Sequence, residues 1–198
     1  MKQNRENPFF ETYRTPFGTP PFDQIETEQY EPAFDEGIWQ LDEEVRAIAD
    51  NTELPTFENT IIALERSGKL LDKVISAFFN VLNAEADDEM MDISQRVSPK
   101  LSESSNNIYL NEQLFARVKS VYDRKDELHL PMEDARLLEK TFEAFCARGA
   151  ALGPEEKEKY RKLSSELSLL SLTFDQNALK DKNRYELLLT KEDELEGL

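Results

Sequence analysis

The residues of this chain best suited to chemistry are its one histidine and its one cysteine. His129 lies in the segment DELHLPMED between two predicted helices, and Cys146 follows Phe145 inside the second of them. A zinc site of the H-E-x-x-H type needs two histidines one helical turn apart on the same face, which a single histidine cannot supply. We therefore predict that His129 is a loop residue without a catalytic role. Cys146 is predicted to be a packed or neutral thiol, because free cysteine is among the most buried residue types.

Acidic residues are abundant, with 41 Asp and Glu against 24 Lys and Arg in 198 residues. Two dense clusters are formed by Glu85, Asp87, Asp88 and Glu89, and by Glu192, Asp193, Glu194 and Glu196. Paired carboxylates can do acid–base work, but at this density clusters arise by chance and are typical of solvated faces or first helical turns. Neither an EF-hand spacing nor a glycine-rich phosphate loop is present. The sequence thus predicts no catalytic, cofactor-binding or metal-binding residue in this chain.

The charge balance restricts the partners and the location of the protein. A net charge of −17 is unsuited to nucleic acid, whose phosphates require a basic surface, and to an anionic membrane surface. No run approaches the roughly 18 apolar residues of a spanning helix, and the N-terminus MKQNRENPFF lacks the apolar core of a signal peptide. One cysteine excludes an internal disulfide. We expect a cytoplasmic protein with no nucleic-acid or membrane partner.

Apolar residues at steps of three and four predict an all-α fold, an irregular bundle of about six helices. The stripe of the first helix is Tyr30, Phe34, Ile38, Leu41, Val45 and Ile48. The second stripe, over about seven turns after an N-cap at Thr56, is Phe57, Ile61, Leu64, Gly68, Leu71, Ile75, Phe78 and Leu82. Leu71 and Phe78 are expected to be buried. Gly68 either lets another helix come close or is a glycine tolerated inside the helix.

Four further helices follow at clear start signals. Asp87 or Asp88 caps the third, which is expected to kink at Pro99, and Asn111 caps the fourth. Pro131 begins the fifth, which ends near Gly149. Pro154 starts the sixth at the first helical position that proline prefers. The sixth helix runs to about Lys180 and carries the apolar stripe Leu163, Leu167, Leu170 and Phe174.

The two ends of the chain are not predicted to be helical. Residues 1–26 are too rich in proline for a helix and too aromatic for a disordered tail, so they are expected to form an extended arm laid over the body. Near the other end, YELLLT (residues 185–190) predicts one short strand, which needs a partner that is not visible upstream. The predicted organisation is an arm (1–26), a helical domain (27–183), and a strand or linker (184–198) leading to further chain.

Six segments in a fixed order carry a family resemblance. They are NPFF, PPFDQI, YEPAFDEGI, PTFENTIIALERSGKLLDKVISAFFNVLNA, NNIYLNEQLFARV and RLLEKTFEAFCARGAAL. From Asn7 to about Asn177 the chain resembles the N-terminal part of the thimet oligopeptidase family of zinc metallopeptidases. Within that family it is most similar to the bacterial peptidyl-dipeptidases.

The resemblance implies an enzyme whose H-E-x-x-H zinc site lies far downstream. No catalytic or metal-binding residue of the family can be matched to a position here, so zinc would belong to the full-length parent and none is expected in this chain. The family likeness implies that this part forms one wall of a deep channel. Its partners would be its own C-terminal catalytic domain and short peptide substrates, and the arm would pack across the wall with Phe22 and Ile25 pinning it.

Two functions remain open. The first is the non-catalytic channel-wall domain of a zinc-dependent peptidyl-dipeptidase that releases C-terminal dipeptides from oligopeptides. The second is a free-standing acidic helical scaffold that binds a partner helix. The unpartnered strand at 185–189 and the uncapped end favour the first function, because both predict more chain.

Overall fold

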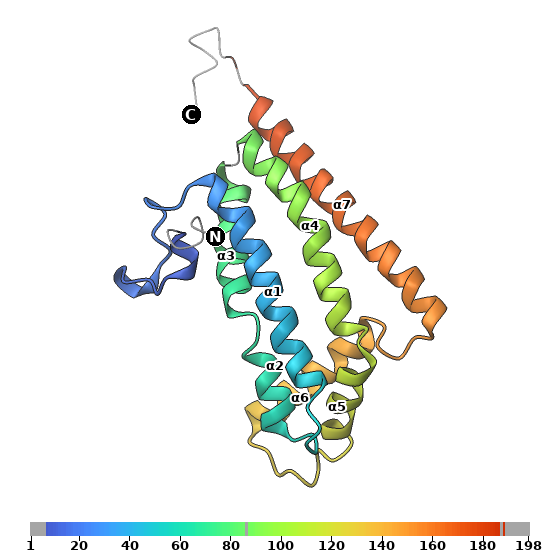
Figure 1. Cartoon of the computed structure of the whole chain (residues 1–198). Coiled ribbons are helices and arrows are strands. Elements are labelled where there is room, and N and C mark those ends of the chain that lie inside the picture. The colour runs from blue at the N-terminus through green and yellow to red at the C-terminus, as the bar shows by residue number, and fades with distance from the viewer. Residues whose placement is uncertain (1–6, 86, 187, 189–198) are drawn as a thin grey trace, which may run out of the picture.

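Helices make up nearly all the regular structure of the computed structural model, which describes residues 7–85, 87–186 and 188 (Figure 1). Six α-helices are longer than ten residues, and a short π-helical turn, η5, leads into the three-residue α2. Their bounds are α1 Tyr30–Ala49, η5 Phe57–Ile62, α2 Ala63–Glu65, α3 Lys69–Glu85, α4 Asp88–Tyr109, α5 Glu112–Tyr122, α6 Met132–Ala147 and α7 Pro154–Arg184. No strand occurs in the described ranges, so the all-α prediction is confirmed. Of the predicted strand, only Tyr185, Glu186 and Leu188 are described, and none of them is in a strand.

Side-chain caps begin three of the helices where the sequence predicts them. Thr56 Oγ1 accepts a hydrogen bond from Asn59 N at 3.1 Å, and Asn59 Oδ1 accepts one from Thr56 N at 2.8 Å. Asp87 accepts from the backbone of the third residue of α4, and Asn111 accepts from that of α5. Each cap satisfies an amide that the first helical turn leaves without a partner. Pro99 lies inside α4 without interrupting it.

The long second helix of the prediction is wrong at Gly68, where the structure divides it. α2 ends at Glu65 and α3 starts at Lys69, while Gly68 has a φ of +75° that an L side chain rarely adopts. Its amide donates to Glu44 Oε2 of α1 at 2.8 Å instead of to a helical carbonyl. The apolar stripe stays in phase on both sides of the break, and for that reason spacing alone predicts one continuous helix.

A close approach of two helices occurs at Gly37 and not at Gly68. A Cβ at Gly37 of α1 would lie 3.0 Å from Leu71 Cα of α3, whereas at Gly68 it would meet only the side-chain tip of Leu41. α1 and α3 therefore pack with almost no side chain between their backbones at this point. This contact aligns the two stripes that form the first core.

The first core cluster lies between α1, α3 and the first half of α4. Its centre is Phe78, whose side chain is fully buried, and Leu71 is also buried, as predicted. The Phe78 ring meets Phe34 edge to face at a centroid distance of 5.3 Å and Tyr30 at 5.0 Å, which is the arrangement aromatic pairs prefer. Phe9, Val74, Ile93 and Val97 are further members whose side chains are fully buried.

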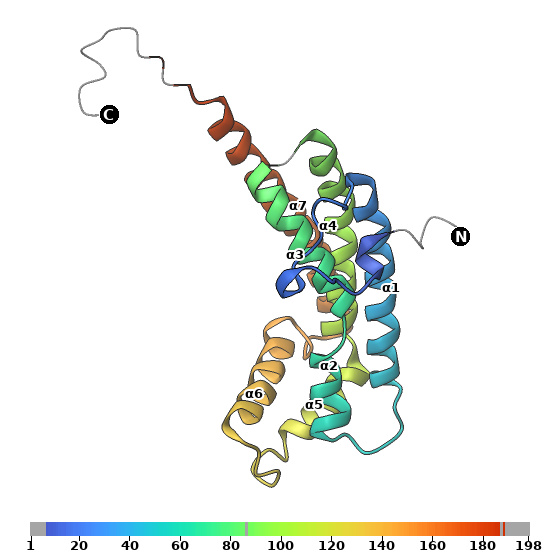
Figure 2. The same cartoon turned by 90° about the vertical axis from the view of Figure 1, so that its left-hand side faces the viewer.

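The second core cluster lies at the opposite end of the bundle, where η5, α2, α5 and α6 surround the end of α1 (Figure 2). Its fully buried side chains are Ile61, Leu114, Val118, Val121, Leu138 and Phe145. Leu41 of α1 touches both clusters. The helix α1 thus connects two separate cores.

A buried arginine ties the loop after α1 to α5. Arg117 is only 7% exposed, and its Nη1 donates to the carbonyls of Asn51 at 2.5 Å and Glu53 at 3.0 Å. Its Nη2 donates to Asn59 Oδ1 at 3.0 Å and Thr60 Oγ1 at 3.3 Å. A planar guanidinium can serve several acceptors at once in this way. One side chain therefore holds both the loop and the start of η5.

The N-terminal arm docks on the first core, but through other residues than expected. Phe9 is 1% exposed and packs against Tyr30 at a centroid distance of 5.2 Å. Ile25 is partly buried against the same cluster, as predicted, whereas the prediction for Phe22 is wrong because its side chain is 52% exposed. Pro21, the preceding residue, takes the buried position instead.

Lys73 of α3 fixes the path of the arm. Its Nζ donates to the carbonyl of Phe9 at 2.8 Å and to that of Glu11 at 2.7 Å, and it lies 3.7 Å from the centroid of the Tyr13 ring. Burial lowers the pKa of Lys73 and raises the pKa of Tyr13 to about 12. One ammonium group thereby holds the first turns of the arm.

We expect Lys73→Met to loosen the arm without unfolding the bundle. The substitution keeps the apolar stem but removes both hydrogen bonds and the cation–π contact, so trypsin should cut after the exposed Arg14 several-fold faster. Lys69→Met, on the exposed side of the same helix, is the matched control. An unchanged cleavage rate in Lys73→Met would show that the other contacts of the arm, such as the burial of Phe9, hold it without Lys73.

The longest helix, α7, turns its predicted apolar stripe away from the bundle. Leu163, Leu167, Leu170 and Phe174 are 55%, 64%, 61% and 73% exposed. α7 continues to Arg184, four residues beyond the predicted end, and packs against α4 (Figure 1). Despite its 31 residues, neither α7 nor any other helix of the described ranges has the length and apolarity to span a bilayer.

Candidate functional site

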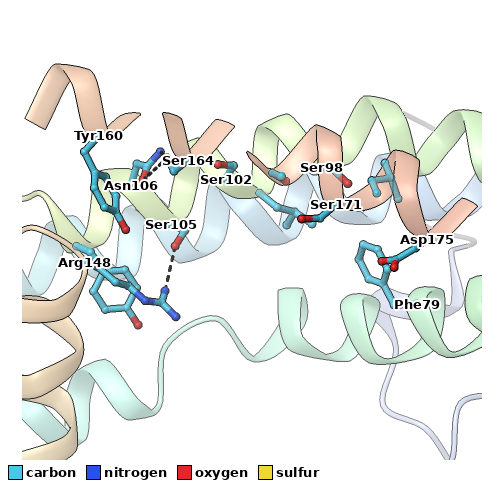
Figure 3. Close-up of a pocket in the computed structure, with 14 residues that line it drawn as sticks. Phe79, Ser98, Ser102, Ser105, Asn106, Arg148, Tyr160, Ser164, Ser171 and Asp175 are labelled. Carbon is cyan, nitrogen blue, oxygen red and sulfur yellow. Dashed lines mark hydrogen bonds between the residues drawn. The ribbon is translucent and has the colours of Figure 1, made fainter. Parts of the chain in front are cut away.

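A serine-lined groove runs between α4 and α7 and has a volume of about 460 Å³ (Figure 3). Three serines of α4 and three of α7 contribute to its walls, together with two tyrosines, one arginine and one aspartate. The hydroxyl-bearing and charged lining residues are Ser98, Ser102, Ser105, Ser164, Ser168, Ser171, Tyr109, Tyr160, Arg148 and Asp175.

The spacing of the serines explains the groove. In each helix they follow steps of four and three, so they lie on one face. The helices run antiparallel, because Asn106 Nδ2 donates to Ser164 Oγ near the start of α7 while Gln176 Nε2 donates to Ser94 Oγ near its end. Two facing rows of short side chains leave unfilled space between the helices.

The two ends of the groove carry opposite charges. At one end Arg148, which follows α6, stacks over the Tyr109 ring at 4.1 Å and donates to Ser105 Oγ at 3.3 Å. At the other end Asp175 lies beside Phe79 of α3 (Figure 3). The groove therefore offers hydrogen-bonding hydroxyls along its length, a cation at one end and an anion at the other.

This arrangement suits binding of polar groups better than bond cleavage. The side chains that bond to the groove serines are Asn106 and Arg148, and neither can take a proton from a hydroxyl. Asp175 is the one carboxylate among the lining residues. We find no pairing of nucleophile and base among these residues.

The two residues best suited to chemistry, His129 and Cys146, lie far apart in the structure. His129 is an exposed turn residue with a φ of +47°, in agreement with its predicted place in a loop. Cys146 is exposed, so the packed alternative of its prediction is wrong. Phe145 takes the buried position, and the next residue of a helix points about 100° away. His129 and Cys146 lie at opposite ends of α6, a helix about 24 Å long.

The acidic clusters have structural positions where they are described. Asp87 caps α4, and Asp88 and Glu89 lie in its first turn, where negative charge is favourable. The cluster from Glu192 to Glu196 lies outside the described residues. Within the described ranges, no group of three or more His, Cys, Asp or Glu residues could hold a metal ion.

Sequence reasoning missed the groove, although its signal is present. Serines at steps of four and three recur in SPKLSESS and in SSELSLLS, each in a predicted helix. A search for apolar stripes passes over them. Two small polar stripes at helical spacing indicate two helices that could face each other in this way.

Comparison with known proteins identifies relatives over most of the chain, although no protein-family model matches it. The chain is 43% identical over 173 residues to dipeptidyl carboxypeptidase of Escherichia coli (strain K12), covering 87% of this chain and 25% of that protein. It is 39% identical to dipeptidyl carboxypeptidase of Salmonella typhimurium, with the same coverage. Organellar oligopeptidase A of Arabidopsis thaliana is 26% identical over 92% of this chain and 23% of its own length.

These matches confirm the predicted resemblance to the oligopeptidases and peptidyl-dipeptidases. They also show that the chain spans about a quarter of the length of the curated relatives it matches.

Proposed function

Because this chain is homologous to a segment of the dipeptidyl carboxypeptidases, we propose that it is a non-catalytic channel-wall part of a zinc-dependent peptidyl-dipeptidase. The complete enzyme would release dipeptides from the C-terminus of oligopeptides. The observation that carries the proposal is 43% identity over 87% of this chain to a named dipeptidyl carboxypeptidase. The role of the chain is steric: its helices limit which peptides reach the catalytic part.

Within residues 7–85, 87–186 and 188, the potential ligands do not come together as a zinc site. Its single histidine is exposed in a turn, and its single cysteine lies at the far end of α6. A catalytic zinc needs three protein ligands and an open position. The metal and the chemistry that it supplies therefore belong to the part of the parent enzyme that this chain does not span.

Rigid packing supports a wall function. The near contact of backbones at Gly37, the edge-to-face aromatic rings around Phe78 and the four bonds of Arg117 each fix neighbouring elements. A domain that excludes larger substrates by its shape must be rigid, because a flexible one would deform and let them pass. Its net charge of −17 would in addition attract basic peptides.

The proposal is tested by a chimera of E. coli dipeptidyl carboxypeptidase in which this chain replaces the homologous quarter. We expect the chimera to bind zinc and to release C-terminal dipeptides from short peptides. The 198-residue chain alone should bind no stoichiometric zinc and hydrolyse nothing. Metal analysis and a peptide assay followed by mass spectrometry measure both properties.

The E. coli enzyme itself is the positive control for each assay. A folded chimera that loads zinc but fails to release dipeptides would count against the wall role. Zinc-dependent turnover by the isolated chain would also contradict the proposal, because it would place the chemistry in residues 1–198.

A further inference from the structure

The exposed stripe of α7 is an apolar surface on a molecule in which 33% of the residues are charged. We define the α7 face as Leu163, Leu167, Leu170 and Phe174, which follow steps of four, three and four and so form one stripe. All four side chains are more than half exposed. The eight residues from Leu167 to Phe174 include no charged side chain, although 33% of the whole sequence is charged.

Polar contacts on the other side of α7 fix this orientation. Gln176 is 8% exposed, and its Nε2 donates to Ser94 Oγ at 3.0 Å in α4. Lys157 is also 8% exposed, and its Nζ donates to Glu112 Oε1 at 3.1 Å and to the carbonyl of Leu110 at 3.3 Å. These buried polar groups would lose their partners if the helix turned its stripe inward. Among the described side chains of α7, the two that are buried are therefore polar, while its apolar stripe is exposed.

Two candidates could cover the α7 face: another segment of the same polypeptide or a second copy of this chain. The length of the relatives, the charge of this chain and the size of the face distinguish them. The chain spans about a quarter of its curated relatives, so about three quarters of such a polypeptide remain to cover surfaces of this part. A second copy of this chain would bring another charge of −17 to the face, and such repulsion opposes self-association. Four large apolar side chains also offer only a few hundred Å², less than the roughly 800 Å² per partner of a stable independent interface.

We propose that the α7 face is an internal interface, covered in the complete enzyme by an apolar segment of the remaining three quarters of the polypeptide. The inference rests on the proposed function, since it takes this chain to be a part of such an enzyme. It goes further by assigning the surface through which the wall is attached. A segment of the same polypeptide is held close by the chain, so a patch too small for a free partner is sufficient.

The test measures solvent access at position 167 in two molecules. Leu167→Cys is made in the isolated chain and in the E. coli chimera, and maleimide labelling is followed at peptide resolution by mass spectrometry. We expect rapid labelling in the isolated chain and at least a tenfold slower rate in the chimera. Met132→Cys, at an 86% exposed position of α6, is the control and should label rapidly in both.

Each outcome has a defined meaning. Equal labelling of position 167 in the chain and in an active chimera would overturn the inference and leave the proposed function standing. Slow labelling in a chimera that fails to release dipeptides would support the interface and count against the function. Slow labelling already in the isolated chain, with dimers in sedimentation analysis, would assign the face to a second copy and overturn the inference.

A charge substitution gives an independent check. Phe174→Glu should leave the helical circular dichroism and the melting temperature of the isolated chain unchanged, since its side chain is 73% exposed there. In the chimera the same carboxylate would be buried without a partner and should lower the melting temperature by several degrees. An unchanged melting temperature of the chimera would contradict the proposed contact.

Discussion

Phe78→Ala is expected to lower the free energy of unfolding by about 3–5 kcal/mol, the range for truncation of a fully buried phenylalanine. The side chain has no exposed surface, and its ring packs against Tyr30, Phe34 and Phe79. The cavity would form about two helical turns along α3 from the backbone contact of Gly37 with Leu71, and that contact limits how far α1 and α3 can move inward to fill it. Urea unfolding of the isolated chain, followed by circular dichroism, measures the loss.

Phe17→Ala is the matched control, because Phe17 is 101% exposed at the tip of a turn in the arm. Its unfolding free energy should stay within about 0.5 kcal/mol of the parent chain. If Phe78→Ala lost less than about 1 kcal/mol, the first core would have to be loosely packed, contrary to the ring contacts described above.

Arg117→Ala is expected to cost about 2–4 kcal/mol, because the guanidinium makes four hydrogen bonds and bonds to charged groups contribute about 1.5–3 kcal/mol each. The expected loss of stability is smaller than the sum of the four hydrogen-bond contributions, because water can bond to part of the loop once the side chain is removed. The loop carbonyls of Asn51 and Glu53 would lose their donor, so the loop should also exchange its amide protons faster. Urea unfolding and hydrogen exchange give the two measurements.

Two further variants at arginine positions sharpen this test. Arg117→Lys keeps the charge, but an ammonium cannot reach all four acceptors, so an intermediate loss is expected. Arg136→Ala removes an exposed arginine that pairs with Glu139 on the surface, and it should change stability by less than about 1 kcal/mol. Equal stability of Arg117→Ala and Arg136→Ala would refute the structural role of Arg117.

Local signals in the sequence predicted the helix starts well. Thr56, Asp87 and Asn111 cap their helices through bonds to backbone amides three residues on, and such contacts depend only on neighbouring residues. The stripes that form the first core were also correct at Leu71 and Phe78. These features need no information about distant parts of the chain.

Features set by distant contacts could not be predicted from spacing. The break at Gly68 depends on an acceptor in Glu44 of another helix, while the stripe continues in phase across it. Periodicity placed Leu167 and Phe174 on one face of α7, but it carries no information on whether that face has a partner within the chain. The same limit applies to Phe22, since the arm contains several aromatic residues and only the tertiary packing selects Phe9.

The residues of the two cores alternate along the chain. This order limits which truncated fragments can fold and the order in which the cores can form during synthesis. The first core takes residues 9–34 and 71–97, and the second takes residues 45–61 and 114–150, so the chain visits each of them twice in alternation. No contiguous stretch contains one core without half of the other. During synthesis the first core can close once α4 has emerged, while Phe57 and Ile61 must wait for α5 and α6 to cover them. Any fragment that ends between Tyr109 and Leu138 would therefore present an uncovered apolar surface from a chain that is already half folded.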